Sequence, residues 1–184
     1  MQVAIRHIFI SPGHNFVGHH GQPAGEHRAI GVPEVICRAG RGLEGDRFHG
    51  YRPDYKGQIS FFAWETYEAV KREFAVPALA PGAFRRNVLV EGADLNALIG
   101  RRFSLGGVIF EGTEESKPCH WMNAAVAPGA EAWLRGQGGL RAKIITDGRL
   151  VVGAAELAVL ADGPELSWTR AIVQDGAVKI RETI

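Results

Sequence analysis

The sequence predicts a mainly β (α+β) protein, built as a partly closed β-barrel with peripheral helices. The chain has 184 residues, 46% of them hydrophobic, so it can bury one sizeable core but not two. Its 24 glycines favour many turns between short strands over a helical bundle. About seven or eight segments carry strand patterns and only two or three carry helical ones, which favours a barrel.

The first half of the chain contains the clearest strand and helix patterns. Residues 2–10 (QVAIRHIFI) alternate in polarity and predict a strand. Residues 29–37 predict a second strand, with Pro33 at an edge or bulge position. A helix is expected to follow Ser60, which would be its N-cap. Its buried stripe comprises Ala63, Tyr67, Val70 and Phe74, spaced three or four residues apart.

The second half predicts further strands joined by tight turns. Asp94 is expected to cap a short turn that Gly100 closes. Asp147-Gly148 is the strongest hairpin turn in the chain. The expected elements are a strand at 86–90, a Gly-Gly hairpin over 101–110, a short helix at 130–135, and strands at 140–146, 149–152 and 157–160.

Composition and charge narrow the classes of function. The net charge is +1, so nothing global indicates binding to nucleic acid or to a membrane surface. No apolar run approaches the roughly 18 residues that span a bilayer, and the N-terminus does not resemble a signal peptide. Two cysteines do not make a disulfide framework, so we expect a cytoplasmic protein with free thiols. We expect residues 1–160 to form one domain, with residues 161–184 as an extension packed on the barrel.

Cys119 is the first candidate for chemistry. It follows Lys117-Pro118, and proline restricts its own backbone and that of the preceding residue, which would hold the thiol in a defined place. A nearby Lys or Arg favours the thiolate, the form that attacks electrophiles and binds soft metals. The alternative is a buried cysteine that packs as a small hydrophobe, which is our interpretation of Cys37. His120 is not expected to act as a base on Cys119, because neighbours on a strand point to opposite faces.

Two further segments supply polar residues for a site. Asp46 either caps backbone N–H groups in its turn or aims Arg47 or Lys56 into a pocket. Lys56 and Gln58 suit an anionic ligand, although a solvated loop explains them nearly as well. In Arg85-Arg86-Asn87, two neighbouring arginines cannot both face the core unpaired, so one is expected to face a site and the other solvent. Arginine clamps phosphate in a bidentate manner, with a plain salt bridge as the alternative.

Other catalytic and binding motifs are weak or missing. Four histidines lie close together, at His14, His19, His20 and His27. This density resembles a metal site, but no CxxC or HExxH spacing supports zinc. The sequence has no nucleotide-binding motif and no nucleophile elbow.

These segments, taken in order, resemble the MOSC domain, a family named for the C-terminal part of molybdenum cofactor sulfurases. The matching segments are GLEGDRFHG, KGQIS before a helix, FRRNVLVEGADLNALIGRRF, KPC and GGLRAKIITDGRLVVG. The resemblance covers about residues 1–160 and is closest to the short stand-alone bacterial type. It implies a MOSC-type β-barrel and a cysteine that carries sulfur or ligates molybdenum in a basic pocket for molybdopterin.

By this resemblance, Cys119 is both the catalytic residue and the ligand of molybdenum, through the cofactor. Asp46 and Arg47 match the family's Gly-Asp-Arg loop, and Arg85 and Asn87 match its Arg-x-Asn strand. The full set of expected cofactor-binding residues is Asp46, Arg47, Lys56, Gln58, Arg85, Arg86, Asn87 and Lys117.

Two features depart from the family pattern. Many relatives end the barrel with Gly-Asp, whereas here Gly153 is followed by Ala154-Ala155-Glu156, and Glu156 would have to replace that acid. The sequence also lacks the pyridoxal-phosphate-dependent desulfurase domain of the full-length sulfurases, so pyridoxal phosphate is not expected in this chain.

Three functions remain open on sequence alone, and only some of them are enzymatic. The first is a molybdenum-cofactor-associated sulfur carrier or molybdenum-binding catalytic domain, with a Cys119 thiolate or persulfide in a basic pocket. Its ligand would be molybdopterin or another anionic small molecule, and its protein partner a cysteine desulfurase, a molybdoenzyme or a reductase. The second is a non-catalytic module that binds an anion or a partner. The third, a cysteine hydrolase or thiol redox protein, lacks a well-placed base and a CxxC motif.

Overall fold

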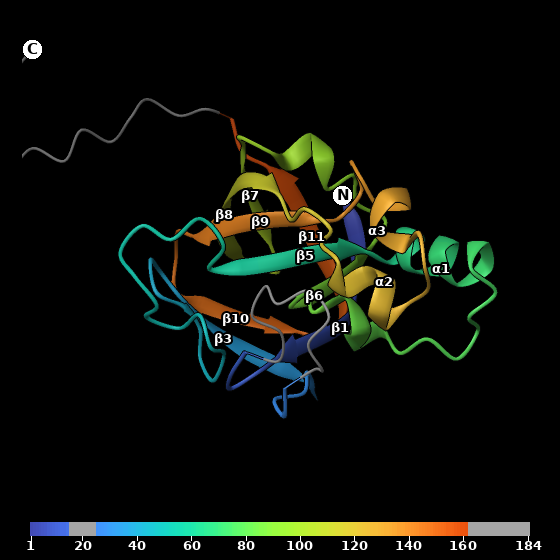
Figure 1. Cartoon of the computed structure of the whole chain (residues 1–184). Coiled ribbons are helices and arrows are strands. Elements are labelled where there is room, and N and C mark those ends of the chain that lie inside the picture. The colour runs from blue at the N-terminus through green and yellow to red at the C-terminus, as the bar shows by residue number, and fades with distance from the viewer. Residues whose placement is uncertain (15–24, 162–184) are drawn as a thin grey trace, which may run out of the picture.

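The computed structural model describes residues 1–14 and 25–161 (Figure 1). The elements are β1 (Gln2–Ile10), β2 (Ile30–Val32), β3 (Glu34–Arg38), β4 (Gly42–Leu43), β5 (Ile59–Ala63), α1 (Trp64–Glu73), η1 (Pro81–Phe84), β6 (Val88–Glu91), η2 (Asn96–Leu98), β7 (Arg102–Leu105), β8 (Val108–Glu115), α2 (Trp121–Ala125), α3 (Ala130–Trp133), β9 (Leu140–Ile144), β10 (Gly148–Val151) and β11 (Gly153–Val159). The expected extension lies outside the described residues from position 162 onward. None of the helices described is long and apolar enough to cross a membrane.

Seven strands close into a barrel. Their order is β11-β7-β8-β9-β5-β6-β1, and β11 pairs back onto β1. At this seam Gln2 lies opposite Glu156 and Ile5 lies opposite Gly153, in antiparallel register. Glu156 is exposed there, so it does not supply a buried acid at the end of the barrel. The predicted barrel is confirmed, and its ring is complete because each of the seven strands has a partner on both sides.

Side-chain alternation along the strands places a core on each side of the barrel wall. Phe61 on β5 packs inside the barrel with Phe103 and Phe110, at ring centroid distances of 5.8 and 5.3 Å. Its neighbour Phe62 belongs to the outer core and stacks on Phe84, with centroids 4.5 Å apart. The helices α1, α2 and α3 lie together on one side of the barrel and cover this outer core (Figure 1).

Most predicted elements are found at or near their expected positions. The strand at 2–10, the hairpin at 101–110 and the last barrel strand are confirmed as β1, β7–β8 and β11. The strand expected over 29–37 is divided at Pro33 into β2 and β3. Asp94 caps its turn as predicted, because its Oδ1 accepts hydrogen bonds from two backbone N–H groups of η2.

The prediction that Ser60 caps the first helix is wrong. Ser60 lies inside β5, and α1 begins at Trp64. The backbone N–H and the hydroxyl of Ser60 donate to Asn87 Oδ1, at 3.0 and 2.8 Å. This serine therefore joins β5 to the segment before β6. The centre of the helical stripe is confirmed, since Tyr67 and Val70 are buried.

The hairpin predicted at Asp147-Gly148 is also wrong. β9 pairs with β5 and β8, whereas β10 pairs with β3 in a separate three-stranded sheet that includes β4. Asp147 accepts a hydrogen bond from the Ala39 N–H at 2.7 Å and forms an ion pair with Arg38, both at the end of β3. These contacts direct the chain out of the barrel, so partners distant in sequence override a strong local turn signal.

Candidate functional site

Cys119 lies on the segment that joins β8 to α2, beside the outer core. Its thiol is free and exposed, whereas Cys37 is free and fully buried. Burial, with a contribution from Asp147, raises the pKa of the Cys37 thiol to about 12, which confirms the core role expected of that residue. Cys119 lines a cavity of about 180 Å³, here called the thiol pocket. Its charged and aromatic lining consists of Arg47, Arg85, Arg86, Arg141, His14, Phe48, Tyr55, Phe84 and Trp121.

Backbone hydrogen bonds fix the segment that carries the thiol. The Ser116 N–H donates to the Gly139 carbonyl at 2.7 Å, and the Cys119 carbonyl accepts a hydrogen bond at the start of α2. Pro118 lies between these two anchors, and its ring limits the backbone conformations available there. Because Cys119 is not on a strand, opposite strand faces do not separate it from His120. His120 is nevertheless not among the residues that line the thiol pocket.

Asp46 both caps its loop and orients an arginine. Its buried carboxylate accepts hydrogen bonds from the Ser11 N–H at 3.0 Å, the Phe48 N–H at 3.1 Å and Asn87 Nδ2 at 3.3 Å. The same carboxylate lies 3.5 Å from Arg47 Nη1. The two alternatives considered for this aspartate therefore hold together. The mostly buried Arg47 side chain is held at the wall of the thiol pocket.

Arg85 reaches the same pocket from the turn after η1. Its backbone adopts a left-handed conformation, with φ 57°, which costs a non-glycine residue roughly 1–3 kcal/mol. Burial lowers the pKa of Arg85, Arg47 lowers it further, and Cys119 acts in the opposite direction. The guanidinium carbon lies 5.7 Å from the Trp121 ring centroid. Two cations thus approach the thiol pocket from separate loops.

Arg86 is not directed to solvent, in contrast to the expectation that one of the two arginines would be. Both Arg85 and Arg86 line the thiol pocket. Arg86 donates three hydrogen bonds to backbone carbonyls, which resolves the difficulty of placing two neighbouring arginines inside the protein. Burial lowers the pKa of Arg86 to about 10, so it remains charged at neutral pH.

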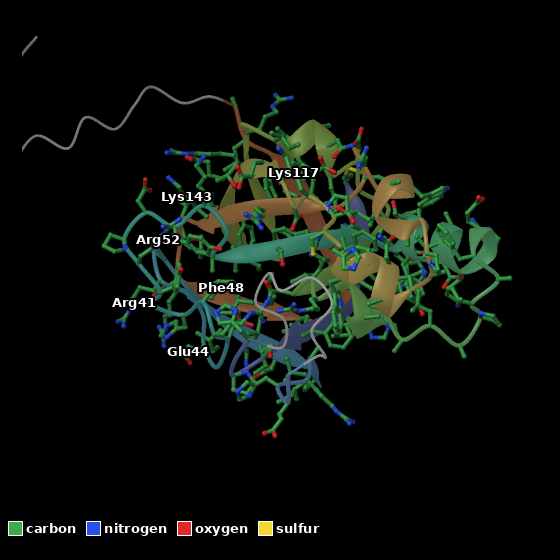
Figure 2. All side chains as sticks on the ribbon, in the orientation of Figure 1. Arg41, Glu44, Phe48, Arg52, Lys117 and Lys143 are labelled. Carbon is green, nitrogen blue, oxygen red and sulfur yellow. The ribbon has the colours of Figure 1, made fainter. Side chains whose placement is uncertain are left out.

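The structure does not bring three of the expected cofactor residues to the pocket. Gln58 is buried in the barrel wall, where its Oε1 accepts a hydrogen bond from the Ile144 N–H at 2.9 Å. Lys56 is exposed, with Nζ 3.8 Å from Glu114 Oε2. Lys117 is exposed as well, and Figure 2 shows it well apart from Phe48, which lines the pocket. The amide oxygen of Gln58 is already bonded to the backbone of β9, and both lysines occupy exposed loop positions.

A second cavity of about 300 Å³ adjoins the thiol pocket. The residues that line both cavities are Arg47, Arg85, Arg86, Asn87 and Trp121. The walls beyond them are mostly apolar and include Phe9, Ala29, Pro81 and Ala83. The two cavities share these residues along their common wall, and together they are here called the cleft, polar on the thiol side and apolar on the other.

Arg141 and Trp121 are among the thiol-pocket residues that sequence reasoning missed. Arg141 lies on β9, with Nη1 3.1 Å from Glu114 Oε1. Polar and apolar residues alternate along β9, and its apolar residues are buried. This alternation would have predicted that Arg141 lies on the outer face of the barrel. Trp121 Nε1 donates to the Ala83 carbonyl at 2.8 Å. Its only sequence signal was an aromatic residue close to Cys119.

The histidine group does not form a metal site in the part of the chain that the structure describes. His19 and His20 lie outside that part. His14 lines the thiol pocket and lies edge-on to Phe48, with ring centroids 5.3 Å apart. Burial and then the nearby arginines lower its pKa. His27 lines the apolar cavity, and among the described residues no three His, Cys, Asp or Glu side chains are placed to hold a metal ion.

The fold and the sequence both have known relatives. The YuaD protein of Bacillus subtilis is 18% identical, with a TM-score of 0.68 over 88% of this chain and 98% of that one. YiiM from Geobacillus stearothermophilus is 15% identical, with a TM-score of 0.63 over 86% and 75%. YiiM from Escherichia coli is 20% identical, with a TM-score of 0.60 over 88% and 70%. No curated protein matches the sequence significantly.

Sequence identities this low indicate a shared fold and nothing further. A family model gives the stronger statement, because the model of the MOSC domain matches residues 19–163. That range contains the thiol pocket almost entirely and covers most of the chain. The chain therefore belongs to the MOSC domain family.

Proposed function

We propose that this domain binds a molybdenum cofactor in the cleft, with the Cys119 sulfur as a ligand of the metal. MOSC domains are associated with the molybdenum cofactor and with sulfur-related roles. The observation that carries the proposal is an exposed thiol in a pocket that Arg47 and Arg85 also line. A thiolate is a soft ligand that suits molybdenum, and guanidinium groups suit the phosphate of molybdopterin.

The residues present fit such a group. Arg47 Nε is buried and has no hydrogen-bond partner among the described residues, so an anionic acceptor would satisfy it. Burial and Arg47 lower the pKa of Arg85, so a negative ligand beside these two cations is electrostatically favoured. Ligand pockets usually measure roughly 300–1,000 Å³, and a cofactor of that size would need both parts of the cleft.

The role of each residue follows from its contacts. Cys119 binds through sulfur, and Arg47 and Arg85 hold the anionic part of the ligand. Asp46 keeps Arg47 in place. Trp121 lines both cavities and provides an apolar wall that limits the access of water. When bound, the cofactor supplies a redox-active metal centre for oxygen- or sulfur-transfer chemistry.

The exposure of Cys119 also favours a second role, as a sulfur carrier. The Cys119 thiolate would attack the terminal sulfur of a persulfide on a cysteine desulfurase. A new S–S bond would form on Cys119 as the donor's S–S bond breaks and the donor leaves as a thiolate. An exposed sulfur can reach the active site of such a donor and of an acceptor molybdoenzyme, whereas a buried one cannot.

The test is to produce the protein in a host that makes molybdopterin and to measure bound molybdenum per chain. We expect Cys119→Ser to bind at least about 10-fold less, since even outer-shell partners of a metal contribute 10–100-fold to its affinity. The matched variant Cys37→Ala should retain the metal, because Cys37 is fully buried and lines neither cavity. Equal molybdenum in wild type and Cys119→Ser would exclude Cys119 as a ligand of the metal.

The carrier role has a separate measurement. Incubation with a cysteine desulfurase and free cysteine should add the mass of one sulfur atom to the wild type and to Cys37→Ala. The Cys119→Ser variant should gain none. A gain of the same size in Cys119→Ser would contradict the carrier role.

A further inference from the structure

We infer that Arg86 is a positioning residue for Cys119. The guanidinium of Arg86 fixes the backbone segment 116–119 so that the thiol faces the cleft. The inference deepens the proposed function and rests on it in one respect, that Cys119 is the reactive group. It also assigns Arg86 a different task from Arg47 and Arg85, which line the cleft at the same place.

The contacts of Arg86 all lead to backbone carbonyls on three different segments. Its Nη2 donates to the Ser116 carbonyl at 2.5 Å, its Nε to the Gly138 carbonyl at 3.0 Å and its Nη1 to the Phe84 carbonyl at 3.0 Å. Ser116 begins the segment that ends at Cys119. One rigid, planar group therefore joins the start of the thiol segment to the segment before β9 and to the end of η1.

Gly138 packs against the thiol segment at the same place. A Cβ atom on Gly138 would lie 2.6 Å from the Ser116 carbonyl oxygen and 2.8 Å from Pro118 Cδ, closer than any real contact. The Gly138 N–H donates to Glu115 Oε1 at 3.1 Å. Segment 116–118 is thus in direct backbone contact with Gly138, and Arg86 bonds to both sides of that contact.

Charge alone does not explain this arrangement, because the geometry requires a fork of donors. A guanidinium has five N–H donors in a fixed plane, and three of those of Arg86 are used on carbonyls. A lysine ammonium is a compact point charge and cannot span three carbonyls on separate segments. Arg86→Lys therefore keeps the charge and removes the clamp, which separates the positioning role from a purely electrostatic one.

The experiment measures whether the Cys119 side chain occupies one environment or several, and it requires no cofactor. A trifluoromethyl-bearing thiol reagent is attached to Cys119, the exposed cysteine, and its ¹⁹F NMR spectrum is recorded. Wild type is compared with Arg86→Lys, Gly138→Ala and the control Arg102→Lys, which alters an exposed arginine on β7 that is paired with Glu111. Urea unfolding of each protein is measured in parallel.

We expect one narrow ¹⁹F line for wild type and for Arg102→Lys, and several lines for Arg86→Lys and Gly138→Ala under conditions where both are folded. A merely structural role for Arg86 predicts reduced stability with the single line preserved, and that result would overturn the inference. If Arg86→Lys does not fold, a single unchanged line in Gly138→Ala overturns it instead. The proposed function is contradicted by a different observation, namely equal amounts of bound molybdenum in wild type and Cys119→Ser.

Discussion

Replacement of Asp46 by alanine removes a buried carboxylate from the centre of a hydrogen-bond network. The buried carboxylate accepts hydrogen bonds from the backbone N–H groups of Ser11 and Phe48 and from Asn87 Nδ2, and it lies 3.5 Å from Arg47 Nη1. Asp46→Ala removes the acceptor from all three donors and the counter-charge from Arg47. We therefore expect a large loss of stability from this one substitution.

The magnitude follows from which donors lose their acceptor. A buried N–H left unsatisfied costs about 1–3 kcal/mol, which applies fully to Ser11 and only in part to the partly buried bond of Phe48. Asn87 Nδ2 retains the Phe9 carbonyl at 3.1 Å, so it adds little. Breaking a buried ion pair costs about 3–5 kcal/mol and includes part of the same loss. We expect a total near 3–5 kcal/mol, which corresponds to a fall in Tm of about 6–20 °C.

Equilibrium urea unfolding, followed by tryptophan fluorescence, measures this loss directly. The matched variant Asp46→Asn keeps the shape and one oxygen acceptor but also removes the counter-charge of Arg47, so it should lose less free energy of unfolding than Asp46→Ala. A loss below about 1 kcal/mol in Asp46→Ala would refute the buried-network reasoning, because that is the typical cost of an average substitution.

Three further predictions concern the buried Cys37, the closely packed Gly139 and the pKa of His14. A thiol reagent should modify Cys119 in the folded protein and Cys37 only after denaturation, because burial raises the pKa of Cys37 to about 12; simultaneous modification of both would contradict the placement of Cys37. Gly139→Ala should cost more than about 3 kcal/mol or prevent folding, because a Cβ there would lie 2.2 Å from the Phe61 carbonyl oxygen at a φ of +98°; a wild-type urea midpoint would count against this. Partial burial, with Arg47 and Arg85 acting in the same direction, lowers the pKa of the largely exposed His14 below 6.5, so its contribution to stability is present above that pH and is lost as the pH falls through the lower folded value. His14→Gln should therefore reduce the loss of stability between about pH 7 and pH 5, and an unchanged pH dependence of unfolding would argue against it.

The barrel could be predicted because its main signals are local. Polarity alternates along residues 2–10, a Gly-Gly pair joins β7 to β8, and Asp94 caps its own turn. The course of the chain at Asp147 could not be predicted in the same way. It depends on a hydrogen bond from Ala39, which is 108 residues away in the sequence, and only the folded chain brings the two together.

The candidate site was predictable in its residue types and less so in their roles. Cys119, Asp46, Arg47 and Arg85 line the cleft as the motifs suggested. Which donors remain for a ligand is decided by tertiary contacts that a motif does not contain. Arg86, for example, has three of its N–H groups on backbone carbonyls, and no feature of Arg85-Arg86-Asn87 distinguishes it beforehand from its neighbour.

Coordination of molybdenum by Cys119 is tested most directly by counting the sulfur atoms around the bound metal. X-ray absorption at the molybdenum edge gives this number per metal atom, for protein loaded in a molybdopterin-producing host. We expect the metal retained by Cys119→Ser to have one sulfur neighbour fewer than the metal in wild type or in Cys37→Ala. An identical number of sulfur neighbours in all three proteins would contradict the assignment of Cys119 as a ligand.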